Sequence, residues 1–254
     1  MYILKLLKFA LQNIFRNRMR SLLTSLGIII GVGSVIVMVA IGQGSQNMIE
    51  AQLESMGTNM LMIYPQRRNR LTKDDLAKIR NESSYIQAVT GLVQRSYTVV
   101  GGESNWSTQV VGTNPDYLTI RSWEVDQGNF FGEEDLESRN RVAVLGTTVV
   151  ENLFPNDNPV GQSIRIGTNH FRVIGVLAPI GAGGMGNDQD DIIIVPLDTA
   201  MSRLNKTRWL NSIQISVVRK EYMSNAQREV EAILKESHNL RADEEADFEI
   251  MNMS

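Results

Sequence analysis

The residues from Gly181 to Gly186 match the Gly-x-Gly-x-x-Gly pattern that holds the pyrophosphate of a dinucleotide. In such sites the pyrophosphate lies at the N-terminus of the helix that follows the glycines. Here the glycines are followed by three acidic residues, which repel phosphate, and then by the β-like run Ile192–Val195. We therefore interpret Gly181–Asp191 as a flexible loop between two strands. The alternative, a nucleotide-binding enzyme, predicts saturable nucleotide binding.

Other residue types that carry catalysis or bind metals are scarce or isolated. The chain has no cysteine, and its two histidines, His170 and His238, belong to no metal-ligand or nucleophile motif. No Gly-x-x-x-x-Gly-Lys-Ser/Thr loop is present, so we do not expect this chain to be the ATPase of a transport machine. Two acidic groups lack the spacing of an EF-hand, and we interpret them as solvated charge: Glu133, Glu134, Asp135 and Asp188, Asp190, Asp191. We expect no catalytic residue, no cofactor and no metal, and the net charge of −3 argues against nucleic acid.

The stretch from Ser21 to Ile41 is predicted to cross a membrane as a helix. It contains no charged residue, and roughly 20 apolar residues span a hydrocarbon core of about 30 Å. Arginine and lysine lie before it, with no acid, which predicts a cytoplasmic N-terminus and a main domain outside. Two of its three glycines, Gly27, Gly31 and Gly33, have the spacing that lets membrane helices approach closely. A cleaved signal peptide ending near Ala40 and a buried helix of a soluble protein are the alternatives.

The segments on either side of this stretch are also predicted to be helical. Residues 1–20 carry apolar residues at helical spacing and the cations Lys5, Lys8 and Arg16, which suits a helix on the inner membrane surface. Those cations are candidates for contact with a cytoplasmic partner, and plain membrane anchoring is the alternative. Residues 42–57 continue in good helix formers and end at Gly57, so one long helix should leave the bilayer.

The remaining part, about 210 residues, is long enough for one sizeable core or two small ones, and its pattern predicts an α+β fold. Residues 58–99 give a strand, a helix that Thr72 and Asp75 start as a capping box, and another strand. Residues 206–254 repeat the order strand, helix, strand. Between them, residues 100–205 show short strands with helical patches at Thr147–Leu153 and Leu197–Arg203. This predicts a split β-α-β subdomain with a β-rich insertion.

Several motifs together resemble one family, the MacB-type ABC permeases of the FtsX-like class. The most specific is the run NIFRNRMRSLLTSLGIIIGV at residues 13–32. The others follow in order almost to the end of the chain: AIGQG at 40–44, GTN at 57–59, VAVLG at 142–146, LFP at 153–155, PVGQ at 159–162, VIGVL at 173–177, Asp190-Asp191 and VPL at 195–197.

The resemblance implies a bacterial inner-membrane permease whose periplasmic part has a porter-like unit and an inserted β-rich unit. It implies contact with membrane lipids, and as partners an ABC ATPase, a second copy or related permease, and a periplasmic adaptor that leads to an outer-membrane duct. ATP-driven motion would pass along a transmission helix that includes Gly42, Gly44, Ile49 and Leu53, and periplasmic domains would expel cargo already in the periplasm. The candidate contact with adaptor or dimer mate is the loop that contains Gly181, Gly184, Asp188, Gln189 and Asp190.

The resemblance also implies three further transmembrane helices after the periplasmic domain, and the sequence ends at Ser254 before them. We therefore expect a fragment or a truncated gene product. The alternative is a single-pass, membrane-anchored protein whose outer domain binds a ligand or partner. The coding sequence beyond Ser254 distinguishes these two possibilities.

Overall fold

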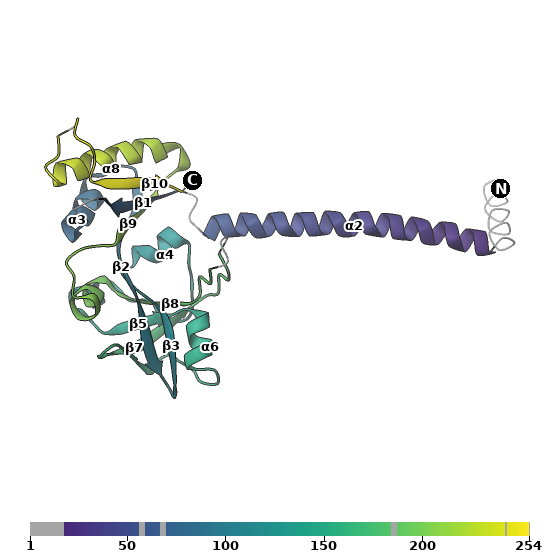
Figure 1. Cartoon of the computed structure of the whole chain (residues 1–254), viewed down its shortest axis with the longest axis horizontal. Helices are drawn as coiled ribbons and strands as arrows, with labels where there is room; N and C mark the ends of the chain where they lie inside the picture. Colours follow the sequence, from purple (N-terminus) through teal and green to yellow (C-terminus); the bar gives the residue numbers. More distant parts are fainter. Residues whose placement is uncertain (1–17, 56–58, 67–69, 184–186, 242, 254) are drawn as a thin grey trace. The chain divides into compact units, whose positions relative to one another are not determined.

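The computed structural model describes residues 18–55, 59–66, 70–183, 187–241 and 243–253 (Figure 1). The chain divides into two compact units, Met1–Ala51 and Gln52–Ser254. Residues 1–17 of the predicted N-terminal helix, with Lys5, Lys8 and Arg16, lie outside the described residues, as do Gly57 and Gly184.

The first described element is one uninterrupted helix, α2, from Arg18 to Ser55. It confirms that the predicted membrane stretch and the helical extension after it form one helix. At a rise of about 1.5 Å per residue, its 38 residues extend about 57 Å, well beyond a hydrocarbon core of about 30 Å.

The second unit is built on one sheet of ten strands. Nine of them follow the order β10-β1-β9-β2-β3-β8-β5-β7-β4, and β6 pairs with β2 and β7. The strands are β1 (Met60–Pro65), β2 (Ile86–Gly101), β3 (Ser104–Thr113), β4 (Val125–Gly128), β5 (Val142–Leu145), β6 (Ser163–Ile166), β7 (Asn169–Leu177), β8 (Ile192–Pro196), β9 (Ser212–Val217) and β10 (Phe248–Asn252).

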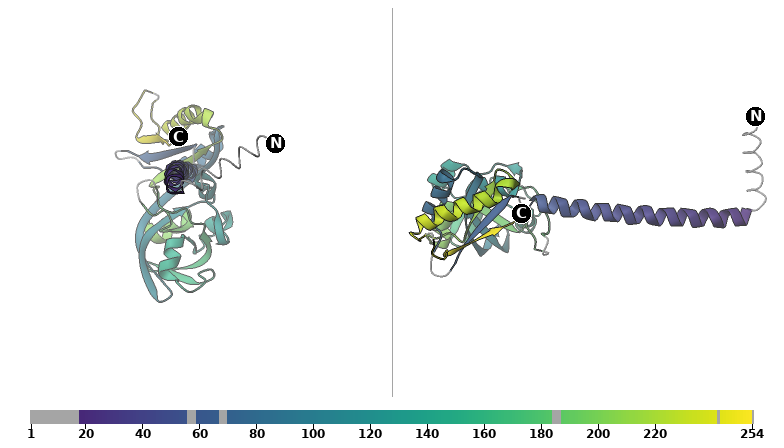
Figure 2. Two further views of the ribbon diagram at one scale, coloured as in Figure 1. Left: turned by 90° about the vertical axis from the view of Figure 1, so that its right-hand side faces the viewer. Right: turned by 90° about the horizontal axis from the view of Figure 1, so that it is seen from above.

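Two strand–helix–strand segments form one end of the sheet, as the repeated pattern predicts. The segment β1-α3-β2 contains helix α3 (Lys73–Glu82), and β9-α8-β10 contains helix α8 (Met223–Ser237). Their four strands are antiparallel neighbours in the order β10-β1-β9-β2, which is the arrangement of a split βαβ fold. The two helices pack against each other beside these strands (Figure 2).

The capping box predicted for α3 is present. The Asp75 amide donates to Thr72 Oγ1 at 3.3 Å, and the Thr72 amide donates to Asp75 Oδ2 at 2.8 Å. These two bonds satisfy amides that the first turn of a helix leaves without partners.

Strand β2 is continuous over 16 residues. Its first half pairs with β9 and its second half with β3 and β6. Gly91 lies in the middle, where a Cβ would lie 2.8 Å from Leu210 Cδ1. Glycine suits this position because Leu210 packs closely on it. The strand passes through residue 99, the predicted subdomain boundary, and the division itself stays a prediction.

The other end of the sheet is buried on both faces, which explains its uninterrupted apolar runs. In β5, Val142 and Val144 belong to one buried cluster and Ala143 and Leu145 to another. Helix α6 (Thr147–Leu153) packs against this end of the sheet, contacting β3, β7 and β8. The first cluster also contains Leu61 and Ile213 from the split βαβ end, so both ends share one core.

Three elements were missed: helix α4 (Asp116–Arg121), strand β4 and helix α5 (Glu133–Glu137). Each has only four to six residues, too few to show a period. The helical patch predicted at Leu197–Arg203 is a short helix, α7 (Leu197–Thr199), followed by a π-helix, η1 (Ala200–Asn205). A 3-10 turn, η2 (Lys220–Tyr222), precedes α8.

Candidate functional site

Helix α2 carries a continuous surface of large apolar side chains. From Arg18 to Gly44 it is the one described helix long and apolar enough to cross a membrane. Its large apolar side chains, from Met19 to Ile41, are 47–76% exposed. At about 25 cal/mol per Å² of exposed apolar surface, such a helix is unstable in water and suits hydrocarbon.

Three hydroxyl side chains within this helix donate to its own backbone. The hydroxyl of Thr24 donates to the Arg20 carbonyl, that of Ser25 to Leu22 and that of Ser34 to Gly31, at 2.9–3.1 Å. Hydrocarbon offers no partner to a free hydroxyl, so this back-bonding suits a span. At Gly27, Gly31 and Gly33 a Cβ would meet no atom within 4 Å, so helix pairing at these glycines stays a prediction.

The segment from Gly181 to Asp191 is a loop between β7 and β8, as predicted, and no helix follows it. Gly181 has a φ of +87°, which glycine adopts without strain. Ala182 and Asp188 form an isolated β-bridge, and the Gly183 amide donates to the Asn187 carbonyl at 2.7 Å. Strand β8 starts one residue after the loop, so a pyrophosphate would find no helix N-terminus there.

Asp190 is buried rather than left as solvated charge, which corrects the prediction for that residue; Asp191 is half-buried and Asp188 is exposed. Asp190 is 5% exposed, and its carboxylate accepts from the amides of Ile180 and Gly181 at 2.9 and 2.8 Å. Asp188 accepts from the Thr148 hydroxyl at 2.6 Å, and Asp191 from the indole N–H of Trp106 at 2.8 Å. Each of these carboxylates therefore fixes the base of the loop.

Gln189 connects the loop to another element. Its Oε1 accepts from the Arg121 guanidinium at the end of α4, at 3.0 Å. Within the described ranges, no group of three or more His, Asp or Glu side chains could hold a metal ion. The structure thus gives the loop a defined base, and contact with a partner stays a prediction.

A buried polar cluster, which the sequence did not reveal, joins α3 to the end of α8 and the start of β10. The His238 side chain is 7% exposed; its Nδ1 lies 2.7 Å from Asp247 Oδ1 and its Nε2 3.4 Å from Asp75 Oδ2. Asp75 also accepts from the Ser237 hydroxyl at 2.5 Å. His238 looked isolated because its two partners lie 163 and nine residues away in the sequence, so only the fold brings the three together.

Several effects act on the Asp75 carboxyl. Burial alone would raise its pKa, but the hydrogen bonds from Ser237 and Thr72, together with nearby His238, lower the pKa below its ordinary value of 3.8. A carboxyl whose pKa is lower in the folded state than in the unfolded chain stabilises the fold at every pH above the pKa of the unfolded chain. That contribution is lost as the pH falls below about 3.8 and through the lowered value.

Asp75→Asn is therefore expected to lower the free energy of unfolding at pH 7 by about 2 kcal/mol, because buried donors lose a charged acceptor. Its stability should also fall less steeply than that of the wild type below pH 4. Urea unfolding of the detergent-solubilised chain at a series of pH values measures both effects. Asp74→Asn, at the exposed neighbouring position of the same helix turn, is the control. Equal stability of Asp75→Asn and wild type at pH 7 would contradict this account.

Comparison with known proteins identifies the family. The sequence model of the family "MacB-like periplasmic core domain" matches residues 21–233. The chain belongs to the MacB family. It is 35% identical over 257 residues to the macrolide export ATP-binding/permease protein MacB of Chlorobium luteolum, and 36% identical to that of Chlorobaculum tepidum. Each match covers 96% of this chain but only 38% and 39% of the relative, so the chain spans less than two-fifths of these MacB proteins.

Two solved structures share the fold of this chain. The periplasmic region of MacB from Actinobacillus actinomycetemcomitans superposes with a TM-score of 0.67 at 24% identity, covering 79% of this chain and 92% of that one. The extracellular domain of the ABC-type transporter YknZ from Gram-positive bacteria gives a TM-score of 0.64 at 17% identity, covering 76% and 100%. The predicted resemblance to MacB-type permeases is confirmed.

Proposed function

We propose that this chain is the membrane-and-periplasmic part of a MacB-type ABC exporter permease. The observation that carries the proposal is the family match, which includes the apolar helix as well as the outer domain. The chain would lie in the bacterial inner membrane with a cytoplasmic N-terminus, because the cations around Arg16 precede the span. Its outer domain would help to expel periplasmic cargo through an adaptor and an outer-membrane duct.

In this proposal α2 transmits motion. An α-helix whose backbone hydrogen bonds continue from Arg18 to Ser55 is stiff, so a shift at its cytoplasmic end displaces the other end. The segment with Gly42, Gly44, Ile49 and Leu53 would carry the motion beyond the bilayer. ATP would be hydrolysed by a separate ATPase, and this chain itself would catalyse no reaction.

The partners follow from the same proposal. The ATPase would contact the N-terminal segment that contains Lys5, Lys8 and Arg16. A second copy or a related permease, or the adaptor, would contact the loop at Gly181–Asp191. Support for that contact comes from the base of the loop, where the buried Asp190 carboxylate accepts from the backbone amides of Ile180 and Gly181 and fixes the start of the loop.

A proline in α2 beyond the membrane segment tests the proposed transmission. Gln46→Pro would remove the amide that bonds to the Gly42 carbonyl and place the ring against that carbonyl, which costs about 3 kcal/mol and kinks the helix. The assembled transporter with a spin label at Glu103→Cys in both copies is expected to show an ATP-dependent change in the distance between labels. That change should be lost in Gln46→Pro. The chain has no cysteine of its own, so within it the label attaches at position 103 alone.

Gln46→Ala is the matched control, because alanine keeps the helix straight, and it should show the wild-type change. A proline variant with the same ATP-dependent change as wild type would show that motion does not pass along α2. A wild-type complex that forms but shows no change with ATP would favour the single-pass binding protein instead.

A further inference from the structure

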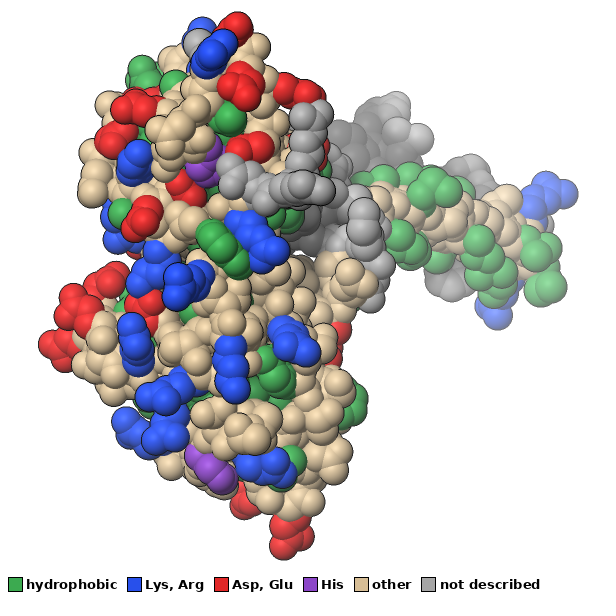
Figure 3. Space-filling model, turned by 60° about the vertical axis from the view of Figure 1, so that its left-hand side comes forward, with side chains coloured by type: hydrophobic (Ala, Val, Ile, Leu, Met, Phe, Trp, Pro, Cys, Tyr) green, Lys and Arg blue, Asp and Glu red, His purple; other side chains and the backbone are tan. Residues whose placement is uncertain are grey.

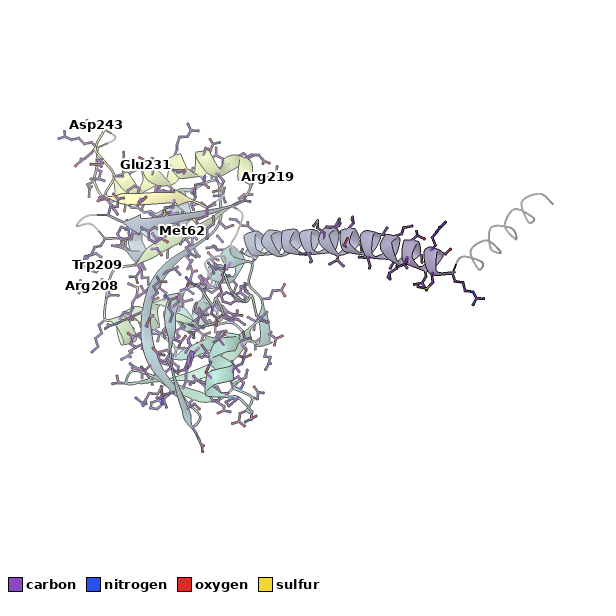
Figure 4. All side chains as sticks on the ribbon, turned by 45° about the vertical axis from the view of Figure 1, so that its right-hand side comes forward. Met62, Arg208, Trp209, Arg219, Glu231 and Asp243 are labelled. Atoms are coloured by element: carbon purple, nitrogen blue, oxygen red, sulfur yellow. The ribbon has the colours of Figure 1, made fainter. Side chains whose placement is uncertain are left out.

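A groove lies beside β2 near residues 93–95, just after the point where its pairing with β9 ends. It has a volume of about 460 Å³, and the residues that decide its chemistry are Arg70, Gln94, Arg95, Trp209 and Asn211. We call it the Trp209 groove. Arg208 and Trp209 project from the segment that follows η1 and leads to β9 (Figure 4).

One wall of the Trp209 groove is a strand edge that stays open. Strand β9 pairs with β2 up to Leu92, and β6 pairs with it from Val99. Between these points β2 has β3 on one edge, and among the described residues no strand on the other. The side chains of Gln94, Arg95 and Ser96 are exposed. An exposed strand edge presents amides and carbonyls to an added strand.

Asn211 shows that backbone groups on this edge of β2 form strand-like hydrogen bonds with a neighbouring segment. Its amide donates to the Leu92 carbonyl at 2.7 Å, and its Oδ1 accepts from the Gln94 amide at 2.8 Å, so one residue acts as the end of a neighbouring strand. Ser96 lies two residues further along, and its backbone groups point to the same edge as those of Gln94 because a strand alternates with a period of two. The open edge therefore begins where Asn211 ends the pairing of β2 with β9, and an added strand could continue the hydrogen bonds from there.

The side chains around the edge are aromatic and cationic. The Trp209 side chain is 40% exposed, and the Arg70 guanidinium lies 5.4 Å from the centre of its ring. Among the described residues, the groove is lined by two arginines, Arg70 and Arg95, and by no Asp or Glu, although the whole chain carries a net charge of −3. Tryptophan and arginine are enriched among the residues that dominate binding energy in protein interfaces.

The surroundings strengthen this positive character. An adjoining hollow of about 440 Å³ shares Thr207 and Trp209 with the groove and adds Lys73, Arg139 and Arg208, against Asp74 and Asp198. In Figure 1 the green segment between η1 and β9 runs along the left-hand side of the domain. Figure 3, which brings that side forward, shows Lys and Arg side chains gathered across its middle.

We propose that the Trp209 groove binds an extended, acidic peptide segment of a partner protein, which adds as a short strand to the open edge of β2. An apolar side chain of the peptide packs on Trp209, and its carboxylates pair with Arg70 and Arg95. Strand addition gives affinity through main-chain bonds and specificity through alternate side chains. The site does not depend on the proposed transport role, since it uses neither the ATPase nor α2.

The test uses the full chain in detergent and a fluorescein-labelled peptide in which glutamates alternate with valines around one central phenylalanine. Fluorescence anisotropy is expected to show saturable binding, weakened at least tenfold by Arg95→Gln and by Trp209→Ala. Arg219→Gln, at an exposed arginine outside the groove, should bind like wild type. The same peptide with lysine for each glutamate should bind at least tenfold more weakly. Unchanged binding in both groove variants, or equal binding of the lysine peptide, would overturn the proposal.

A second readout locates the peptide independently of affinity. In a chain without natural cysteine, Ser96→Cys should form a disulfide with a peptide that carries a cysteine at its centre, and Ser138→Cys, exposed elsewhere, should not. Circular dichroism melting of each variant establishes that it is folded before binding is compared. Equal cross-linking at both positions, or absence of saturable binding to the folded wild type, would exclude the site.

Discussion

Gly31→Arg is expected to prevent stable membrane integration of this chain. Gly31 lies at the middle of the span Ser21–Ile41, where an arginine costs about 2.5–3.5 kcal/mol on insertion scales, roughly a hundredfold in the insertion equilibrium. The span already contains three glycines and several hydroxyl residues, so its apolar residues leave only a small margin. Alkaline extraction of membranes, followed by quantification of the chain in pellet and supernatant, measures the effect.

Gly31→Leu is the matched control for this measurement, because it adds volume without charge. No described atom lies within 4 Å of a Cβ at this position, so both variants are tolerated within the helix itself. The leucine variant should stay in the membrane pellet. Full retention of Gly31→Arg in the pellet would mean that Gly31 does not lie at the middle of a membrane-spanning segment.

Gly146→Ala is expected to lower the free energy of unfolding by about 3 kcal/mol, at the upper end of what added core volume costs. A Cβ at Gly146 would overlap the backbone carbonyl oxygen of Asp190. That carbonyl cannot withdraw easily, because the Asp190 carboxylate holds the amides of Ile180 and Gly181, and the Gly146 amide donates to the Ile192 carbonyl at 2.9 Å. For a domain of this size the melting temperature should fall by about 6–12 °C.

The control is Gly132→Ala, since a Cβ there meets nothing within 4 Å. Its stability should stay within about 0.5 kcal/mol of wild type. Thermal unfolding followed by the fluorescence of the tryptophans compares the two variants directly. If Gly146→Ala melted at the wild-type temperature, the loop would not be anchored by Asp190 as described.

The sequence was sufficient to predict those helices and strands that depend on residues close together in the chain. The capping box at Thr72 and Asp75 needs only neighbouring residues, and it starts α3 where expected. The runs Val142–Leu145 and Ile192–Val195 are apolar throughout because both of their faces are buried, so they could be predicted as strands without knowledge of their partners.

What the sequence did not reveal depends on residues far apart in the chain. The close packing of Leu210 on Gly91 is one example. His238 gains its role from Asp75, and the Trp209 groove forms only because β9 and β6 pair with different parts of β2. The motif at Gly181–Gly186 was assigned to a loop because the sequence after it lacks a helix, and β8 confirms that reasoning.

Recovery of an ATPase with the intact chain tests the central claim most directly. An affinity-tagged chain would be cross-linked in cells of its source organism, solubilised from membranes, purified and identified with its partners by mass spectrometry. The account predicts that an ABC ATPase is recovered with the wild-type chain and with Gly31→Leu, and that it is lost with Gly31→Arg. A wild-type chain that is recovered from the membrane fraction with no ATPase would contradict the exporter proposal.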